Sequence, residues 1–544
     1  MYLRGILIMK NKPYPLYNTL PQIKDLKEMV KSRAGDTPGD VCFSYTDDDG
    51  KLVEKTCYDF DREIDALGTY LYSEGFHDKN IAIIGENSYD WLVCFFAITN
   101  GGNVVVPIDK DQPEDMAITL LKQSDCDAVI IAGNYTKLKN PPKGLKVYNM
   151  SELMNYQAKG THLISSGDTS FIDYNIDPER LAAIFFTSGT TGISKGVMLS
   201  QKNMASDINA ACKNFILDGN SLSVLPFHHT FGLITAIFMV FNYRRATYIN
   251  RSLKYLLKEL AVVRPQTLFL VPLFVENFYK RIVQNAKKRG KEKMLKAAMK
   301  NSEILLKFGL DFREKFFKEI LQTFGGNLEF IICGGAPLNE HYVKAFRAFG
   351  IEILNGYGIT ECSPVLSVNR NHYHRDGSVG QILDGIDIRI SEDDEIVVKG
   401  DNVMMGYYKD NISTAQAFTE GWYRTGDLGH IDEDGFLFIT GREKNLIILS
   451  NGENVSPEEL EMLVGVVPGV CECVVYSDDK GIVAEIFPEE DYLNNQPHFD
   501  AKIAEINKKL PVFKRINSVK LRSSEFPKNS SKKILRNKIN VEQQ

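Results

Sequence analysis

A short segment near the middle of the chain combines small, hydroxyl-bearing and basic residues, the types that bind phosphate. Residues 187–196 read Thr-Ser-Gly-Thr-Thr-Gly-Ile-Ser-Lys-Gly and follow an apolar run over residues 181–186 that is typical of a buried strand. Glycines let a backbone turn tightly, and its N–H groups can then surround an anion. The residues expected to bind phosphate are Thr187, Ser188, Gly189, Thr190, Thr191, Gly192 and Lys195.

The spacing of the glycines separates this loop from the P-loop of nucleoside triphosphatases. That pattern requires four residues between its first glycine and Gly-Lys-Ser/Thr, whereas Gly189 and Gly192 have only two residues between them. The alternative interpretation is a flexible surface turn. Three hydroxyls, a lysine and a preceding strand seldom coincide by accident, so phosphate binding is the favoured hypothesis.

The elements that must position this loop alternate between strand and helix. Strands are expected over residues 80–84, 103–108 and 128–132, with helices over 88–99 and 113–123 between them, and this rhythm predicts a parallel sheet covered by helices. It returns at a second set of candidate strands, over residues 223–226, 267–271 and 328–333. From about residue 377, short strands over 387–390, 395–398 and 436–439 favour a small β-barrel or curled sheet.

Length and composition agree with a globular protein of three or four structural units. The chain has 544 residues, of which 44% are hydrophobic and 25% are charged. Proteins that bind nucleic acid usually carry a basic surface, so the net charge of −6 argues against nucleic acid as a partner. The longest apolar stretch, residues 224–241, contains His228 and His229, so we interpret it as buried core and expect no transmembrane segment.

The cysteines and the first residues favour a cytoplasmic protein. Nine cysteines lie between Cys42 and Cys473 with no regular spacing, which is typical of reduced thiols. The apolar residues 1–8 are too short for a signal peptide, and Met9 is an alternative start. The lysine-rich residues 283–300 are expected to form a helix with a solvated face.

Four further motifs follow the phosphate loop in a fixed order. They are Asn-Gly-Tyr-Gly-Ile-Thr-Glu at 355–361, Tyr-Arg-Thr-Gly-Asp at 423–427, Gly-Arg-Glu-Lys at 441–444, and Pro-Lys-Asn-Ser-Ser-Lys-Lys-Ile-Leu-Arg at 527–536. Together the five motifs resemble those of the adenylate-forming superfamily, which includes acyl-CoA synthetases, peptide-synthetase adenylation domains and luciferases. Residues 328–361 and 450–455 are most similar to fatty acyl-CoA ligases and acyl–carrier-protein ligases.

The resemblance implies a fold and a reaction. The expected fold is α/β: residues 1–443 form a large domain of two βαβ-type subdomains plus a small distorted β-barrel, and residues 444–544 form a small mobile α+β domain. The implied reaction joins a carboxylic acid, a medium- to long-chain fatty acid, to AMP at the expense of ATP, and then transfers the acyl group to the thiol of coenzyme A. The implied cofactors are ATP, Mg²⁺ and coenzyme A.

The resemblance also assigns the nucleotide to particular residues. Thr360 would contact the α-phosphate, and Glu361 would bind Mg²⁺, which prefers carboxylate and phosphate oxygens. Asp427 would accept hydrogen bonds from the ribose, with Arg442 assisting. The remaining nucleotide-binding positions are Gly335, Ala336, Tyr357 and Gly358, where the tyrosine would stack on adenine, together with the phosphate loop.

The C-terminal domain would supply the catalytic lysine and move between two poses. Lys533 would bridge the acyl carboxylate and the α-phosphate, although Lys532 stands where the usual motif has glycine, which leaves the register open. Lys444 is the expected hinge. Gly452 and Glu453 would lie in a loop that faces the thiol in the second pose, unless Gly452 belongs to a plain strand turn. The basic residues 501–544 would contact coenzyme A or an acidic carrier protein, or form only a solvated surface.

The acid itself is the least specified part of the pattern. Residues 225–232 resemble the acid-pocket motif of acyl-CoA ligases, and His229 would lie near the reacting carboxylate, with a core histidine as the alternative. None of these eight residues is acidic, which argues against an amino acid substrate. Residues 233–241 and 273–278 would line an acyl channel or belong to the core. The alternative functions are an acyl–carrier-protein ligase and a non-catalytic nucleotide-binding regulator, which would have lost Lys533, Glu361 or Asp427.

Overall fold

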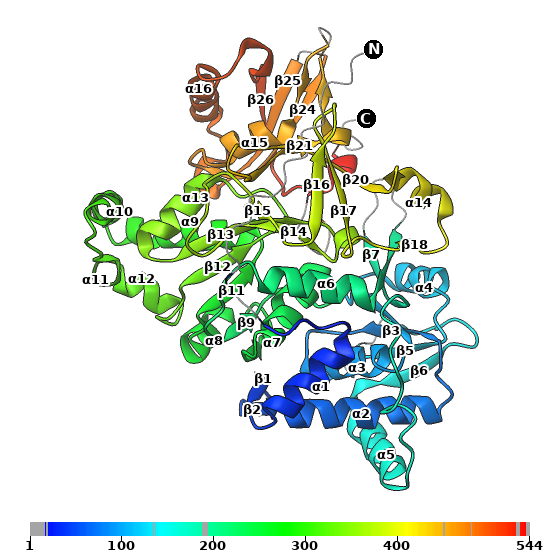
Figure 1. The fold of residues 1–544 in the computed structure, drawn as a ribbon. Helices are drawn as coiled ribbons and strands as arrows, with labels where there is room; N and C mark the ends of the chain where they lie inside the picture. The colour runs from blue at the N-terminus through cyan, green and yellow to red at the C-terminus, as the bar shows by residue number, and fades with distance from the viewer. Residues whose placement is uncertain are drawn as a thin grey trace.

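The computed structural model describes residue 17 and residues 20–133, 135, 138–187, 194–449, 452–479, 481–528 and 534–539. Within them the chain forms a large N-terminal domain and a small C-terminal domain, which lies at the top of Figure 1. Two mixed sheets with flanking helices and a third, antiparallel sheet make up the N-terminal domain, so the expected α/β architecture is confirmed. Every helix in these residues is too short or too polar to cross a lipid bilayer.

Seven strands form the first sheet, in the order β18-β8-β7-β4-β3-β5-β6. The strands from β7 to β6 are parallel, and β8 and β18 add an antiparallel edge. Strands β3 and β4 are apolar along nearly their whole length because both faces of the parallel sheet are covered by helices. Ser88 caps α3 by accepting a hydrogen bond from the Trp91 N–H, as expected for a serine before an apolar helix.

The elements of this sheet and its helices are α2 (Cys57–Ser73), β3 (Asn80–Ile84), α3 (Tyr89–Thr99), β4 (Val104–Ile108), α4 (Glu114–Gln123), β5 (Ala128–Ile131), β6 (Lys146–Asn149), α5 (Leu153–Ser165), β7 (Leu181–Thr187), β8 (Lys195–Ser200), α6 (Gln201–Cys212) and β18 (Gly406–Tyr407).

Nine strands form the second sheet, in the order β15-β14-β13-β12-β11-β9-β10-β1-β2. Its strands from β13 to β1 are parallel, and β2, β14 and β15 are antiparallel edges. The strand expected over residues 223–226 was misplaced, because β9 covers Ser221–Ser223. The chain leaves the sheet before Pro226, whose missing N–H cannot support a strand ladder.

The elements of this sheet and its helices are α1 (Leu26–Asp36), β1 (Val41–Thr46), β2 (Leu52–Thr56), β9 (Ser221–Ser223), the π-helix η2 (Phe231–Phe238), α7 (Met239–Asn242), β10 (Thr247–Ile249), α8 (Leu256–Val263), β11 (Thr267–Leu270), β12 (Phe330–Cys333), α13 (Glu340–Phe349), β13 (Glu352–Gly358), β14 (Val365–Val368) and β15 (Gln381–Ile382).

The third sheet is curled, and the strand pairings among the described residues do not close it into a barrel. Its order is β16-β17-β20-β19, with β21 paired to β20, and every pairing is antiparallel. An isolated bridge between Gln381 and Phe436 is one of its connections to the second sheet. Its elements are β16 (Ile386–Ile390), β17 (Glu395–Gly400), α14 (Asn411–Ala417), β19 (Phe418–Thr419), β20 (Trp422–Ile431) and β21 (Leu437–Arg442).

The C-terminal domain has its own hydrophobic core, which contains buried residues from Ile447 to Ile516. It combines a three-stranded sheet, β24-β25-β26, with a short β22–β23 hairpin and two helices. Its elements are β22 (Ile447–Ile448), β23 (Asn454–Val455), α15 (Pro457–Gly465), β24 (Val470–Asp478), β25 (Gly481–Pro488), α16 (Gln496–Asn507) and β26 (Ser518–Leu521).

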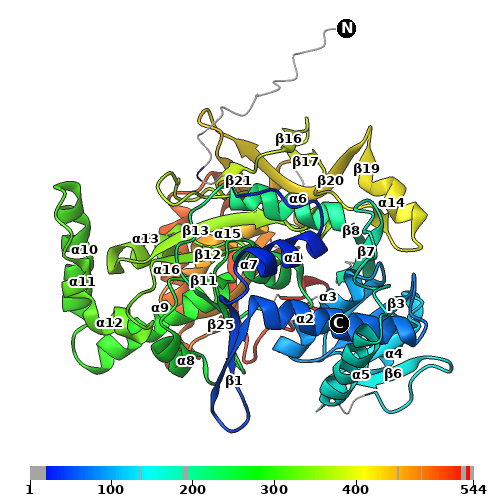
Figure 2. The same ribbon diagram turned by 60° about the horizontal axis from the view of Figure 1, so that its bottom comes forward.

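Four helices between β11 and β12 form a projection that we call the helical arm, residues 272–323. They are α9 (Pro272–Lys288), α10 (Glu292–Lys307), α11 (Arg313–Phe316) and α12 (Lys318–Thr323). The single helix expected over residues 283–300 is wrong in extent, because the chain turns at Gly290, where φ is +67°. The far end of the arm stands away from the sheets in Figure 2.

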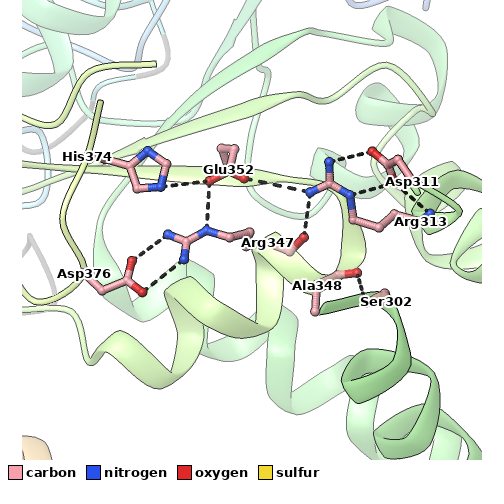
Figure 3. A network of polar contacts seen from close by, with 8 residues as sticks. All are labelled: Ser302, Asp311, Arg313, Arg347, Ala348, Glu352, His374 and Asp376. Atoms are coloured by element: carbon pink, nitrogen blue, oxygen red, sulfur yellow. Dashed lines mark hydrogen bonds and ion pairs between the residues drawn. The ribbon is translucent and has the colours of Figure 1, made fainter. Parts of the chain in front are cut away.

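A polar network fixes the base of the arm against the start of β13, the strand that leads to the predicted adenine-binding residues (Figure 3). Arg347 of α13 donates two hydrogen bonds to Asp376, of 2.6 and 3.0 Å, and one of 3.2 Å to Glu352. Arg313 of the arm donates to the Arg347 carbonyl over 3.1 Å and lies 3.9 Å from Glu352. Because these carboxylates are largely shielded from water, they depend on the two arginines for their charge balance.

We predict that Arg347→Ala lowers the free energy of unfolding by about 2 kcal/mol, because it leaves Asp376 and Glu352 partly buried without their main counter-charge. Urea denaturation would measure the loss. The matched control is Arg289→Ala, which breaks an exposed pair with Glu319 and should cost less than about 0.5 kcal/mol. Equal losses in the two variants would contradict the structural role of the network.

Candidate functional site

One large cavity, of about 1650 Å³, lies where the two mixed sheets, the curled sheet and the C-terminal domain meet. Strand ends and loops supply its lining, as is usual for ligand sites at the carboxyl ends of parallel strands. The predicted site residues that line it are Thr187, Lys195, His229, Gly335, Ala336, Tyr357, Gly358, Thr360, Glu361, Arg442 and Lys444. Ser188, Gly189, Thr190, Thr191, Gly192 and Lys533 lie outside the described residues.

Two glycines are required by the backbone beside the cavity. Gly335 follows β12 with φ of +85°, a conformation that side chains oppose. At Gly358, the last residue of β13, a Cβ atom would lie 2.1 Å from the Pro364 carbonyl oxygen. These positions therefore let the main chain approach a ligand and another strand more closely than any larger residue would allow.

A buried carboxylate joins the curled sheet to the second sheet. Antiparallel pairing of β20 and β21 places Asp427 opposite Arg442, and Arg442 Nε lies 2.7 Å from Asp427 Oδ1. The Tyr357 hydroxyl donates to Asp427 Oδ2 over 2.7 Å. Asp427 is only 3% exposed and is absent from the cavity lining, so its direct contact with a ligand stays a prediction.

The surroundings of Tyr357 keep its hydroxyl protonated. Burial, followed by the neighbouring Asp427 carboxylate, raises the pKa of Tyr357 well above its ordinary value. The phenol is therefore a neutral donor to Asp427. Its ring lines the cavity beside Gly358, which leaves an aromatic surface for a flat ligand.

Glu361 places a second carboxylate in the cavity, from the short 3₁₀ turn η3 (Thr360–Cys362) after β13. The Tyr407 hydroxyl donates to its Oε1 over 3.0 Å. Burial raises the pKa of Glu361 above its ordinary value, and the hydrogen bond from Tyr407 opposes this shift. Lys195 lies beside the same tyrosine, with its Nζ 4.7 Å from the ring centre.

Sequence reasoning missed Tyr407, and no motif marks it. It reaches the site because β18 pairs with β8, which brings residue 407 opposite Val197. Glu395 was missed in the same way: it accepts hydrogen bonds from Arg424 Nε over 2.8 Å and from the Gly426 N–H over 3.0 Å, and it holds the loop that leads to Asp427.

Two adjacent histidines lie between β9 and η2 and line the cavity. The rings of His228 and His229 are 4.3 Å apart, and His228 Nε2 lies 3.8 Å from Asp109 Oδ2. Burial, assisted by His228, lowers the pKa of His229 to about 3. His229 is therefore a neutral ring at neutral pH, able to donate and accept hydrogen bonds.

The two apolar segments proposed for an acyl channel divide between core and cavity. In residues 233–241, Leu233 and Ile234 are fully buried core residues, and only Thr235 reaches the lining. In residues 273–278, Leu273 and Phe274 both line the cavity. The second segment therefore supplies an apolar wall, whereas the first mainly supports it.

Residues of the C-terminal domain close one side of the cavity. Lys528 and Lys538, on either side of the undescribed residues 529–533, are part of the lining, and neither was predicted. Lys444 is exposed within the 3₁₀ turn η4 (Glu443–Asn445) and also contributes. Gly452, with φ of +85°, and Glu453 form the turn between β22 and β23 and do not line the cavity.

A group of charged residues ties both ends of the C-terminal segment to one helix, α15. Arg536 forms ion pairs with Glu461 and Glu458, and it donates to the Val475 carbonyl over 3.2 Å. Asn445, which follows Lys444, also donates to Glu458. The segment after Lys444 and the segment after residue 533 therefore share a rigid support.

Comparisons with known proteins agree with this geometry. The family profile described as AMP-binding enzyme matches residues 30–408. The long-chain-fatty-acid–CoA ligase FadD15 of Mycobacterium bovis is 30% identical over 524 residues, which cover 88% of this chain and 85% of that protein. The chloroplastic long-chain-fatty-acid–[acyl-carrier-protein] ligase AEE15 of Arabidopsis thaliana is 27% identical to this chain. The alignment covers 76% of this chain and 68% of that protein.

A solved structure shows the same fold. The o-succinylbenzoate CoA synthetase of Bacillus subtilis, in complex with its acyl-adenylate intermediate, superposes with a TM-score of 0.74 at 20% identity, covering 96% of this chain and 98% of that chain. The family profile spans more than half of the present sequence, and the mycobacterial relative matches most of it. This protein therefore belongs to the AMP-binding enzyme family, the adenylate-forming ligases.

Proposed function

We propose that this enzyme activates a medium- to long-chain fatty acid with ATP and transfers the acyl group to coenzyme A. The observation that carries the proposal is one cavity lined by Tyr357, Arg442, Glu361, the neutral His229 and an apolar wall, with the buried Asp427 bound to both Tyr357 and Arg442. Such a cavity suits both a nucleotide and an acid with a hydrocarbon chain. Residues 1–443 would form the nucleotide and acid domain, and residues 444–544 the moving domain.

The nucleotide would lie along the ends of β12, β13, β20 and β21. Tyr357 would stack on adenine between Gly358 and the Gly335–Ala336 turn. Arg442, oriented by Asp427, and Asp427 itself would hold the ribose, because each carboxylate oxygen can accept a second hydrogen bond. Thr360 would contact the α-phosphate, and the loop from Thr187 to Lys195 would hold the outer phosphates.

The acidic residues fit a magnesium ion that is bound partly by the nucleotide. Among the described residues, no three His, Cys, Asp or Glu side chains are grouped as a complete metal site. A lone buried carboxylate at Glu361 suits Mg²⁺, which usually takes one or two protein ligands and completes its shell with phosphate and water oxygens. When bound, Mg²⁺ would offset charge on the phosphates.

In the first step, a carboxylate oxygen of the acid attacks the α-phosphorus, and the bond from that phosphorus to the oxygen of the leaving pyrophosphate breaks. His229 would orient the acid as a neutral hydrogen-bonding group, because its pKa of about 3 keeps it uncharged at neutral pH. Lys533 would offset the negative charge shared by the two reacting groups. In the second step, the thiol sulfur attacks the acyl carbonyl carbon, and AMP leaves.

Coenzyme A is the proposed acceptor of the acyl group. A carrier-protein acceptor is supported by the Arabidopsis relative, whose name states that acceptor. A reducing compartment, the cytoplasm, is supported by the nine cysteines, none of which forms a disulfide bond within the described residues. The non-catalytic alternative is disfavoured because Glu361, Asp427 and Lys533 are all present.

A panel of acids from acetate to palmitate tests the function. With ATP and Mg²⁺, we expect pyrophosphate release to be strongest for medium or long chains, since Leu273 and Phe274 supply an apolar wall. Thioester formation with coenzyme A, compared with a holo-carrier protein, then identifies the acceptor. Absence of pyrophosphate, AMP and acyl-AMP with every acid would refute the proposed activity.

Lys533→Ala should slow acyl-AMP formation by roughly 10²- to 10³-fold or more, the scale for loss of one oriented charged donor. Thioester formation from supplied acyl-AMP should be spared, and rapid quenching of each half-reaction separates the two. Lys532→Ala is the matched control and should retain both steps. A larger defect in the Lys532 variant would move the catalytic role to that residue.

Lys444→Pro should hinder thioester formation far more than adenylation, because proline fixes φ and a hinge must change its backbone angles. Single-turnover assays should then show accumulation of acyl-AMP. Lys444→Ala keeps the backbone free and serves as the control. If thioester synthesis is unchanged in the proline variant, residue 444 is not the hinge.

A further inference from the structure

The helical arm carries a strong local positive charge in a chain that is acidic as a whole. Residues 287–318 contain eleven Lys or Arg and four Asp or Glu, a net charge of +7, whereas the whole chain carries −6. Three of these basic residues form ion pairs, Arg289 with Glu319, Lys296 with Glu292 and Arg313 with Asp311. Within the described residues, no ion pair forms at the exposed Lys287, Lys288, Lys291, Lys293, Lys300, Lys307, Lys315 and Lys318.

The same arm exposes large apolar side chains that the fold leaves uncovered. Their exposed fractions range from 42% for Phe312 to 77% for Phe308. Phe312 and Phe316 lie close to each other, with ring centres 6.2 Å apart. The exposed apolar residues of the arm are Met294, Ile304, Phe308, Leu310, Phe312 and Phe316. A soluble protein seldom gathers so many exposed aromatic and aliphatic groups in one place without a partner.

The opposite side of α10 is fixed to the protein, so the exposed side has a defined direction. Leu295 and Met299 pack against the core that lies beneath β12 and α13. Ser302 donates to the Ala348 carbonyl over 3.1 Å, a contact visible in Figure 3. Because helical positions repeat every 3.6 residues, Met294, Ile304 and Phe308 fall on one outward stripe.

Three of these lysines border that stripe on one side. Lys293, Lys300 and Lys307 are spaced by seven residues and form a row next to it, while Glu292 and Glu303 lie farther round the helix, on the other side of the row. An apolar strip bordered by lysines is the pattern of helices that lie in the interface of an anionic bilayer, with the apolar residues among the acyl chains and the lysines at the phosphates.

We propose that the outer face of the helical arm, formed by these apolar residues and the lysine row, docks this enzyme on an anionic lipid surface. The arm projects beyond the sheets in Figure 2, so a flat surface can reach it. An acidic carrier protein is the less favourable occupant, because no described residue from 280 to 323 lines the cavity where the thiol must react. The proposal does not depend on which acid is the substrate.

Co-sedimentation of the full-length enzyme with vesicles tests the proposal without any turnover. We expect binding to phosphatidylcholine vesicles that contain phosphatidylglycerol, weak binding to phosphatidylcholine alone, and a loss of binding as salt is raised. If the enzyme fails to sediment with the anionic vesicles, or sediments equally with both kinds, the lipid proposal is wrong. Because no ATP is present, this result is independent of the proposed ligase activity.

Charge-reversal variants distinguish a specific contribution of the lysine row to lipid binding from a general effect of net charge. Lys293→Glu, Lys300→Glu and Lys307→Glu together should lower the partition coefficient by at least about 100-fold, since each lysine near such a surface contributes about 1 kcal/mol. The matched control combines Lys143→Glu, Lys508→Glu and Lys509→Glu, three exposed lysines elsewhere, and should bind like the unmodified enzyme. An equal loss in the control would overturn the assignment to the arm.

The apolar contribution is tested with Phe308→Ser and Phe312→Ser, which should reduce binding by about tenfold or more because two large side chains no longer enter the bilayer. Both residues are exposed, so the unfolding midpoint should be unchanged. Light scattering of the free enzyme tests the competing interpretation, in which this face joins two copies of the chain. If the unmodified enzyme is a dimer that these two substitutions dissociate, the face is a contact between two copies and the lipid proposal fails.

Discussion

The arrangement of the site depends on one buried carboxylate. Asp427 lies on β20, and its first partner Arg442 lies opposite it on β21. Its second partner, Tyr357, lies near the end of β13 in another sheet. Removing one member of a buried, charged cluster leaves the others without compensation, which typically costs about 3–5 kcal/mol. This cluster therefore fixes the curled sheet against the second sheet and sets the direction of both Tyr357 and Arg442.

The same arginine is the last residue of β21 before the chain enters the C-terminal domain. Beyond Lys444, Asn445 and Arg536 both bind Glu458, so the start of that domain and the segment after residue 533 are held by one helix. Because both segments are bound to α15, they form one packed unit with the core of the C-terminal domain. Such an arrangement suits a reaction in which two chemical steps need different groups beside the same carbonyl.

The electrostatic character of the cavity follows from burial. Low exposure to water raises the pKa of Glu361 and lowers that of His229, so burial disfavours the charged form of both side chains. Apolar residues of the segment after β11 complete the wall, and Lys195, Lys444, Lys528 and Lys538 contribute positive charge around it. The cavity lining thus combines charged and polar groups with apolar side chains.

The sequence by itself determined the family and the α/β architecture, and it predicted a set of site residues, because glycine-rich turns, strand ends and ordered motifs are local features. Tyr357, Thr360 and Glu361, which belong to one predicted motif, all line the cavity because a single strand and turn carry them. Only the tertiary structure placed Tyr407 on Glu361, Glu395 behind the Asp427 loop, and Asp427 behind Tyr357 rather than in the lining. Those contacts join residues far apart in the chain through strand register and packing, which no local pattern specifies. For the same reason, only the folded structure showed which apolar side chains of the helical arm stay exposed to water.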